Sequence, residues 1–288
     1  MKKTISTALG LLAAATGLAS TTMDPAHKQA YGANVGWINA AGDVTHGAVI
    51  GQAVCSGYLY GANVGWIHLG DGSPVDGQAY GNASATDYGV NHDGLGQLTG
   101  YAYGANIGWI NFEQTHGQPR VDLRTGVLSG SVWGANVGWI SLSNAVAFAR
   151  TETLSPGPDS DADGIPDHWE YAHFGQLAKL SKDGADLDGD GASDVDEYFA
   201  GTDPGDAADV LVITDFQMNG TTHAVTWPAK PNRLYTLQYT TALSNGTSWV
   251  TAAAPFVPAS GAAVTKPVSG MGDAVRFYRV QAAPPLHP

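Results

Sequence analysis

Two twelve-residue segments carry the residues best suited to bind a ligand, Asp159–Glu170 (DSDADGIPDHWE) and Asp186–Glu197 (DLDGDGASDVDE). Each segment has a carboxylate at positions 1, 3, 5, 9 and 12 and a glycine at position 6. Calcium takes about six to eight oxygen ligands, and a loop with this spacing supplies them from alternate carboxylates, one main-chain carbonyl and a bidentate glutamate. Two full matches predict two Ca²⁺ sites.

The predicted ligands follow directly from these positions. The first site comprises Asp159, Asp161, Asp163, the carbonyl of Ile165, Asp167 and Glu170. The second site comprises Asp186, Asp188, Asp190, the carbonyl of Ala192, Asp194 and Glu197. His168 and His173 offer an alternative as transition-metal ligands, but calcium prefers hard oxygen donors and the carboxylate spacing favours it.

The two loops resemble the EF-hand family, and more closely its relatives that lack the entering helix, such as dockerins and thrombospondin type 3 repeats. Leu154–Pro158 contains two prolines and a glycine, which exclude a regular helix before the first loop. A short helix is expected after each loop, with Gly175 and Gly201 as the C-terminal stops.

Charge is concentrated around these loops. Between Thr151 and Asp209 the sequence holds 16 of its 26 acidic residues and 2 of its 13 lysines and arginines. The rest of the chain is close to neutral and has no basic patch, which argues against a nucleic-acid partner. Clustered carboxylates repel one another without a cation, so folding of this segment is expected to be coupled to calcium binding.

The first residues predict secretion. Met1–Lys3 is positively charged and Ala8–Ala19 is apolar, so residues 1–19 are typical of a bacterial signal peptide. We expect an extracellular, cell-surface or periplasmic protein, and no second segment is hydrophobic and long enough for a membrane span. The single cysteine, Cys55, has no disulfide partner and is interpreted as a small buried residue, with a reactive thiol as the alternative.

Residues 20–150 contain a repeat. An aromatic residue followed by Gly-Ala-Asn-Val/Ile-Gly-Trp-Ile occurs four times, at Tyr31–Ile38, Tyr60–Ile67, Tyr103–Ile110 and Trp133–Ile140. Spacings of 29, 43 and 30 residues between successive copies predict adjacent copies of one supersecondary unit. The motif resembles an aromatic-glycine repeat (GYAWGxNIGWINF type) of secreted bacterial proteins, for which no activity is established.

Each repeat is expected to form short antiparallel strands joined by a Gly/Asn turn, with the Asn side chain capping its own turn. The aromatic residues have two interpretations. The favoured one is an internal ladder that buries the repeat faces, and the alternative is exposed platforms for sugar rings. A ligand surface would be sought first at the polar position after each Trp-Ile pair, occupied by Asn39, His68, Asn111 and Ser141.

The C-terminal region, residues 209–283, shows alternating apolar and polar residues over about six short strands. Its stretches VTW, LYTLQY and RFYRV resemble fibronectin type III-like modules, which implies a small β-sandwich with Trp227, Tyr235 and Tyr278 in its core. Residues 151–208 are then a connector that carries the calcium loops, and residues 284–288 form a tail.

Motifs of common enzyme classes are missing from the sequence: there is no GxSxG, HExxH, phosphate-binding loop or CxxC pair. A glycosidase-like pair of carboxylates among Asp43, Asp71, Asp93, Glu113 and Asp122 stays open, because such residues meet in space and not in sequence.

The sequence therefore predicts a mainly β protein with a repeat domain, a short α-containing connector and a β-sandwich. We expect a secreted calcium-binding structural or adhesive protein, whose partner is an extracellular protein or a glycan. The alternatives are a carbohydrate-binding protein that uses the repeat aromatic and Asn residues, and a dockerin-like module that captures a protein partner.

Overall fold

The computed structural model describes residues 21–177, 180, 184–244, 247–269 and 275–288. The predicted signal peptide lies outside these residues. The described chain contains eighteen strands and two short helices, so the mainly β class is confirmed. It forms two compact units, one made of residues 21–162, 166–177 and 286–288, the other of residues 163–165 and the described part of 178–285.

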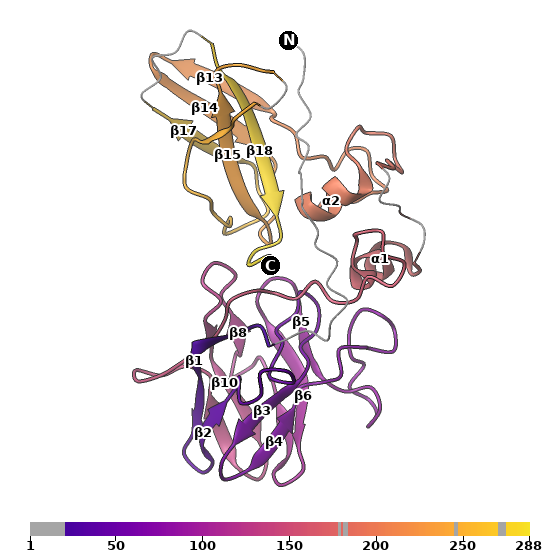
Figure 1. Cartoon of the computed structure of the whole chain (residues 1–288), viewed down its shortest axis with the longest axis vertical. Helices are drawn as coiled ribbons and strands as arrows, with labels where there is room; N and C mark the ends of the chain where they lie inside the picture. The colour runs from indigo at the N-terminus through magenta and orange to yellow at the C-terminus, as the bar shows by residue number, and fades with distance from the viewer. Residues whose placement is uncertain (1–20, 178–179, 181–183, 245–246, 270–274) are drawn as a thin grey trace. The chain divides into compact units, whose positions relative to one another are not determined.

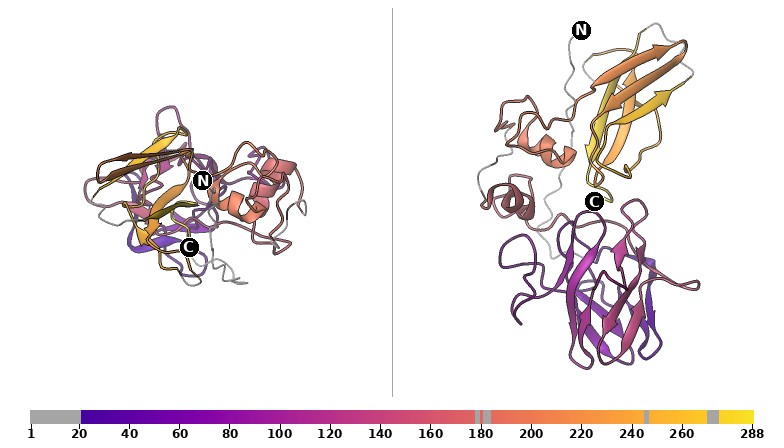
Figure 2. Two further views of the ribbon diagram at one scale, coloured as in Figure 1. Left: turned by 90° about the horizontal axis from the view of Figure 1, so that it is seen from above. Right: turned by 180° about the vertical axis from the view of Figure 1, so that it is seen from behind.

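Eight strands of the first unit form a closed antiparallel sheet (Figures 1 and 2). Going round the sheet they are β1 (Met23–Gly32), β2 (Gly36–Asn39), β3 (Tyr58–Gly61), β4 (Gly65–His68), β6 (Leu98–Gly104), β7 (Gly108–Asn111), β10 (Ser131–Gly134) and β11 (Gly138–Ser141). The sheet closes because β11 pairs with β1, Tyr31 lying opposite Ser141. Each copy of the repeat is therefore one hairpin of a four-hairpin closed sheet.

Four shorter strands extend this unit. They are β5 (Val90–His92), which pairs with β6, β12 (Ala149–Thr151), which pairs with β1, and the separate pair β8 (Arg120–Val121) and β9 (Leu128–Ser129).

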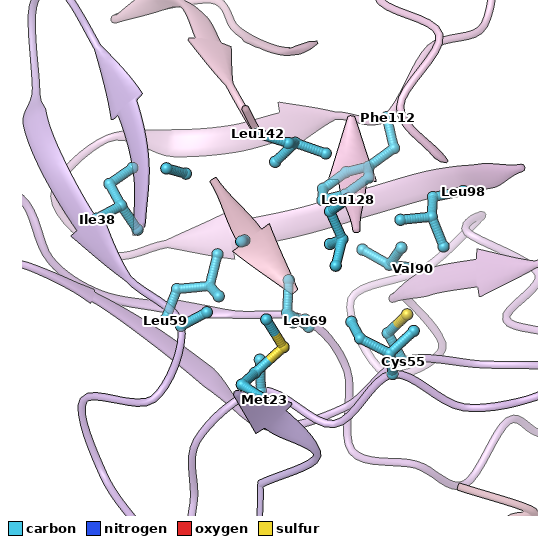
Figure 3. Close-up of a pocket in the computed structure, with 15 residues that line it drawn as sticks. Met23, Ile38, Cys55, Leu59, Leu69, Val90, Leu98, Phe112, Leu128 and Leu142 are labelled. Atoms are coloured by element: carbon cyan, nitrogen blue, oxygen red, sulfur yellow. The ribbon is translucent and has the colours of Figure 1, made fainter. Parts of the chain in front are cut away.

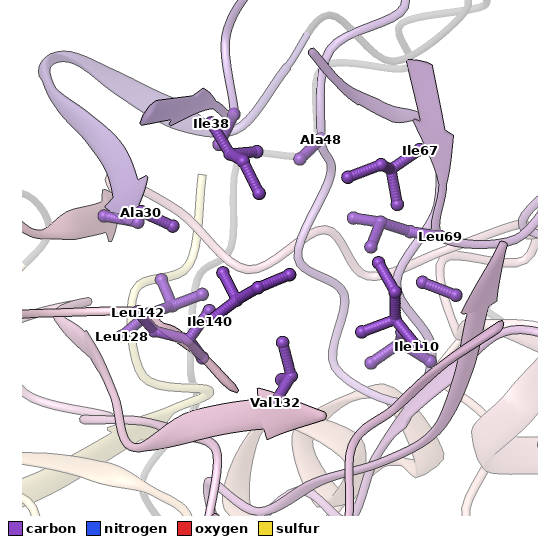
Figure 4. Packing of buried hydrophobic residues seen from close by; sticks show 14 of the residues in the cluster. Ala30, Ile38, Ala48, Ile67, Leu69, Ile110, Leu128, Val132, Ile140 and Leu142 are labelled. Atoms are coloured by element: carbon purple, nitrogen blue, oxygen red, sulfur yellow. The ribbon is translucent and has the colours of Figure 1, made fainter. Parts of the chain in front are cut away.

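The interior of the closed sheet is filled by equivalent residues of the four repeats. Ile38, Ile67, Ile110 and Ile140 are each at most 2% exposed, and Figure 4 shows them converging from different strands. Alternation along each strand turns every second side chain inward. The apolar interior follows from the Trp-Ile pair of the motif, in which Ile faces in and Trp faces out.

The first glycine of each motif leaves room for the turn that follows it. A Cβ on Gly32 would lie 2.7 Å from the side chain of Val35, and one on Gly134 would lie 2.5 Å from Val137. Real Cβ atoms do not approach other carbons this closely, so the valine or isoleucine of the turn packs over a bare backbone position. Val35 is 1% exposed and closes one end of the interior.

The motif asparagine does not cap its own turn, and that prediction was wrong. Each Asn side chain instead donates a hydrogen bond to a main-chain carbonyl in the turn of a neighbouring hairpin. The four bonds run from Asn34 to Val137, Asn63 to Val35, Asn106 to Val64 and Asn136 to Ile107, at 3.0–3.1 Å. The second glycine of each motif has φ near +77° and lies against the incoming amide. The asparagines thus link the four turns into a ring.

The favoured interpretation of the repeat aromatics as an internal ladder was also wrong. The two aromatic residues of each motif are cross-strand partners, and all eight are 38–47% exposed on the outside of the closed sheet. Their ring centroids lie 4.8–5.0 Å apart in the four hairpins. The physical reason is the strand alternation: the isoleucine next to each motif tryptophan faces the interior, so the tryptophan and its cross-strand partner face outward.

The interior contains a small cavity of about 40 Å³, lined only by apolar atoms (Figure 3). Sites for small molecules usually measure about 300–1,000 Å³, so this cavity is a packing defect and not a ligand site. Cys55 lines it and is 1% exposed, as predicted for a small buried residue. Burial raises the pKa of its thiol to about 12, which keeps the sulfur protonated and unreactive at neutral pH.

The second unit contains two three-stranded sheets. One has the order β13 (Asp215–Asn219), β14 (Thr222–Trp227), β17 (Val264–Val268), and the other β16 (Val250–Thr251), β15 (Leu234–Thr240), β18 (Phe277–Ala283). Trp227 and Tyr235 are at most 1% exposed in the shared core, as predicted, whereas Tyr278 is only partly buried at its margin. The sandwich expected from the alternation is therefore present.

Two helices follow the acidic loops, α1 (Asp167–Phe174) and α2 (Asp194–Ala200). They end at Gly175 and Gly201, both left-handed with φ of 68° and 73°, as the sequence predicts. No helix in the described part of the chain has the length and apolar character needed to cross a membrane.

Candidate metal centre

The two acidic loops have the same local construction. Each helix begins at position 9 of its loop, so the glutamate at position 12 lies in the first helical turn. Gly164 and Gly191, at position 6, have φ of 94° and 96°. Only glycine adopts such angles readily, so both loops reverse direction at the residue that the spacing predicts.

The hydrogen bonds inside the loops also correspond. The carboxylate at position 5 accepts the N–H of position 7 in both, from Ile165 to Asp163 at 2.8 Å and from Ala192 to Asp190 at 2.7 Å. The N–H at position 9 donates to the carbonyl just before the loop, at 2.9 Å in both. These bonds hold the main chain of both loops in a turn. In the second loop the Asp186 side chain also supports the turn, because its two oxygens accept the N–H groups of Gly189 and Gly191 at 2.7 and 2.9 Å.

The loops bring together the first three carboxylates of each predicted site. Ligand atoms of Asp159, Asp161 and Asp163 lie within 4.8 Å of one another, as do those of Asp186, Asp188 and Asp190. Both triads can hold a metal ion, and both consist of hard oxygen donors. His168 and His173 belong to neither cluster within the described residues.

The carboxylates at position 9 lie outside the triads and support the loop instead. Asp167 accepts the N–H of Ser160 at 2.7 Å, and Asp194 accepts the N–H of Leu187 at 3.0 Å. This arrangement suits a position that in such loops often acts on the ion through a water molecule.

The position-12 glutamates are the most buried acidic residues of the loops. Glu170 and Glu197 both have no exposed surface, and Ile165, whose carbonyl is a predicted ligand, is equally buried. Carboxylates are almost never fully buried unless they are paired or bind a cation. Burial of Glu170 and Glu197 beside other carboxylates is therefore unfavourable unless a positive charge lies nearby.

Glu197 shows the problem most clearly. Its Oε1 accepts a hydrogen bond from the Thr202 hydroxyl at 3.2 Å, but its Oε2 is buried without a hydrogen-bond partner. Asp188 and Asp190 each have one carboxylate oxygen that is also buried without a hydrogen-bond partner. Burial, followed by the charges of the nearby aspartates, raises the pKa of Glu197 to about 8. Glu197 lies outside the group of atoms within 4.8 Å of one another, which consists of Asp186, Asp188 and Asp190. A divalent cation at this group would offset the clustered negative charge, so the hard oxygen donors present fit calcium.

Sequence reasoning missed two residues that position Glu197. Ser193 is the N-cap of α2 and accepts the N–H of Asp196 at 3.2 Å, and the Thr202 hydroxyl binds the glutamate itself. Ser193 could have been found from its place before the helix. Thr202 follows the helix stop and carries no sequence signal for this contact.

The scattered acidic residues of the first unit have local structural roles. The side chains of Asp43, Asp71, Asp93, Glu113 and Asp122 each accept main-chain N–H groups of the residues that follow them. Such bonds to its own loop lower the pKa of Asp43. These carboxylates stabilise turns, as expected for Asp at the first position of a loop.

Known proteins add nothing to this description, because no protein family, no curated protein and no solved structure matches the chain. The resemblances to EF-hand-like loops, to the aromatic-glycine repeat and to fibronectin type III-like modules therefore stay predictions.

Proposed function

We propose that this protein is a secreted, calcium-binding structural or adhesive protein of the cell exterior, in which two Ca²⁺ ions order the acidic segment between two β units. The observation that carries the proposal is Glu197, a fully buried carboxylate with an unpartnered oxygen beside an aspartate triad. An ion at this point would convert mutual repulsion into coordination.

The chain's own residues would hold the ions as follows. In the second loop the triad, the carbonyl of Ala192 and Glu197 would supply the oxygen ligands, while Asp194 would support the loop and act through a water. The first loop uses the equivalent positions. The bound ion supplies two positive charges, and these offset clustered negative charge that otherwise opposes folding.

Each helix is anchored to its own β unit, so an ion would stabilise more than its loop. The Tyr171 ring of α1 packs directly on Gly77 of the first unit. Ala200 of α2 belongs to the sandwich core, and the Arg233 side chain donates to the carbonyl of Tyr198 at 2.9 Å. Calcium would thus stiffen the chain where it leaves each unit, as a structural or adhesive role requires.

Calorimetric titration of the full chain with Ca²⁺ tests the proposal. We expect two ions per chain for the natural protein and one for Glu197→Gln, because the amide cannot coordinate as a bidentate anion. The matched control is Asp196→Asn, which removes the same charge one residue earlier at a position that is not a predicted ligand. Two undiminished sites in Glu197→Gln, or no binding by the natural chain, would contradict it.

A further inference from the structure

The fold explains the glycines, the asparagine, the valine or isoleucine of the turn and the last isoleucine of the repeated motif, but not its aromatic residues. The glycines allow the turn, the asparagine links neighbouring turns, the valine and isoleucine fill the interior, and both aromatic side chains face solvent. A cross-strand aromatic pair contributes only about 0.2–1 kcal/mol to stability. Four copies of an exposed pair therefore point to a surface with a further use.

The outer surface is not the same all round the closed sheet. Two adjacent hairpins, β3–β4 and β6–β7, carry a third aromatic residue, Tyr58 and Tyr101, at the position opposite His68 and Asn111. The other two hairpins have Gln29 and Ser131 at the equivalent position, opposite Asn39 and Ser141.

Ring contacts join the two hairpins with a third aromatic residue, β3–β4 and β6–β7, into one aromatic surface. Tyr88, from the loop inserted between them, stands perpendicular to Trp109 with ring centroids 4.9 Å apart. Its hydroxyl lies 2.8 Å from Nδ1 of His68, and the His68 ring packs on Tyr58 at 4.7 Å. Tyr58 in turn touches Trp66. We call this continuous surface, from Trp66 through His68 and Tyr88 to Trp109, the aromatic face.

The aromatic face is uncharged. Strands β3, β4, β6 and β7 contain no Asp, Glu, Lys or Arg. Burial lowers the pKa of His68, so this ring is neutral at neutral pH. The nearby acidic residue is Asp71, in the loop after β4, whose charge acts on both His68 and Tyr88. The aliphatic residues of these strands face the interior, so rings, hydroxyls and amides make up the outer surface.

We propose that the aromatic face binds an uncharged polysaccharide. Pyranose rings present flat C–H faces that stack on Trp and Tyr, and hydroxyls at their rims that bond to phenol, imidazole and amide groups such as His68 and Asn111. A surface without charge matches a ligand without charge, and a continuous row of rings matches a ligand that repeats. Trp66 and Trp109 are 46% and 44% exposed, which leaves ring surface for stacking. This inference is independent of the calcium sites.

Affinity electrophoresis of the full chain in gels containing hydroxyethyl cellulose, xylan or glucomannan tests the proposal. We expect at least one of these neutral polysaccharides to retard the protein, with or without chelator. Trp109→Ala should weaken retardation about tenfold, as expected for loss of a central aromatic contact. Tyr88→Ala should weaken it as well.

The repeat provides a matched control in Trp139→Ala. Trp139 occupies the same motif position as Trp109, is 43% exposed, and pairs with Trp133 outside the aromatic face. Both substitutions remove a cross-strand partner, and Trp109→Ala removes the contact with Tyr88 as well. The melting temperatures of both variants are therefore measured beside binding, and Trp139→Ala should change binding by less than about twofold. Equal loss of binding in both variants would overturn the proposal.

Two further outcomes would also overturn it. One is no retardation by any of the three polysaccharides. The other is a different occupant, seen as binding to phosphatidylcholine vesicles or as self-association in analytical ultracentrifugation that Trp109→Ala abolishes.

Discussion

The turns of the closed sheet and the acidic loops are both repeated motifs built on glycines with positive φ. They differ in whether their polar side chains find hydrogen-bond partners within the protein. In the turns, each Asn amide donates to a carbonyl of the neighbouring turn. In the second loop, Asp188, Asp190 and Glu197 keep buried oxygens without hydrogen-bond partners. A motif whose polar groups all form hydrogen bonds within the protein builds the fold. A motif that contains buried carboxylate oxygens without hydrogen-bond partners indicates a bound ligand.

This comparison predicts that the two regions respond differently to calcium. The closed sheet should owe its stability to apolar burial and its own hydrogen bonds, without calcium, and the loops should owe theirs to an ion. Three measurements test that separation.

The largest effect is expected inside the closed sheet. Ile67 has no exposed surface, and Ile67→Ala should lower the free energy of unfolding by about 2–5 kcal/mol, through lost transfer energy and the cavity left behind. Denaturant unfolding of the first unit should give the same loss with calcium and with chelator. The exposed Val146→Ala serves as the control with little effect. A loss that depends on calcium would break the comparison.

Chelation should have the next largest effect, and it should be local. At a free calcium concentration 100 times the dissociation constant, each bound ion stabilises the folded state by about 2.7 kcal/mol. Hydrogen exchange should therefore show that amides of α1 and α2 lose protection in chelator, while those of β3 and β4 keep theirs. Equal protection of both helices in the two conditions would refute the coupling between calcium and local folding.

The smallest effect is expected in the ring of asparagines. Asn106→Ala removes one hydrogen bond to the carbonyl of Val64 and should cost about 1 kcal/mol. Because the ring is repetitive, Asn34→Ala should cost a similar amount, and calcium should alter neither value. Thermal unfolding with and without chelator measures both. A markedly unequal cost would show that the four turns are not equivalent.

Much of the fold could be predicted from the sequence because the signals are local. Alternation located most strands of the sandwich and the core residues Trp227 and Tyr235, and glycines marked both helix ends. Strand β13 was not predicted, although Phe216 and Met218 alternate with polar residues in Asp215–Asn219; the strand is short and exposed along its whole length.

The two wrong predictions, of the asparagine bond and of the aromatic orientation, both concern contacts between different copies of the repeat. The partner of each Asn lies in another hairpin, and Asn34 and Val137 are 103 positions apart in the sequence, so no spacing within one motif reveals it. Whether Trp faces in or out depends on which side of the strand becomes the interior, and that is decided only when the sheet closes.

The sequence by itself determined the β class, the repeat unit, the acidic loops and their turn glycines, because each depends on residues close together in the chain. Only the tertiary structure decided that four hairpins close on themselves, that the isoleucines take the interior, and that two hairpins share one aromatic face. Those features follow from pairing between distant strands, which decides which side of each strand becomes the interior of the closed sheet.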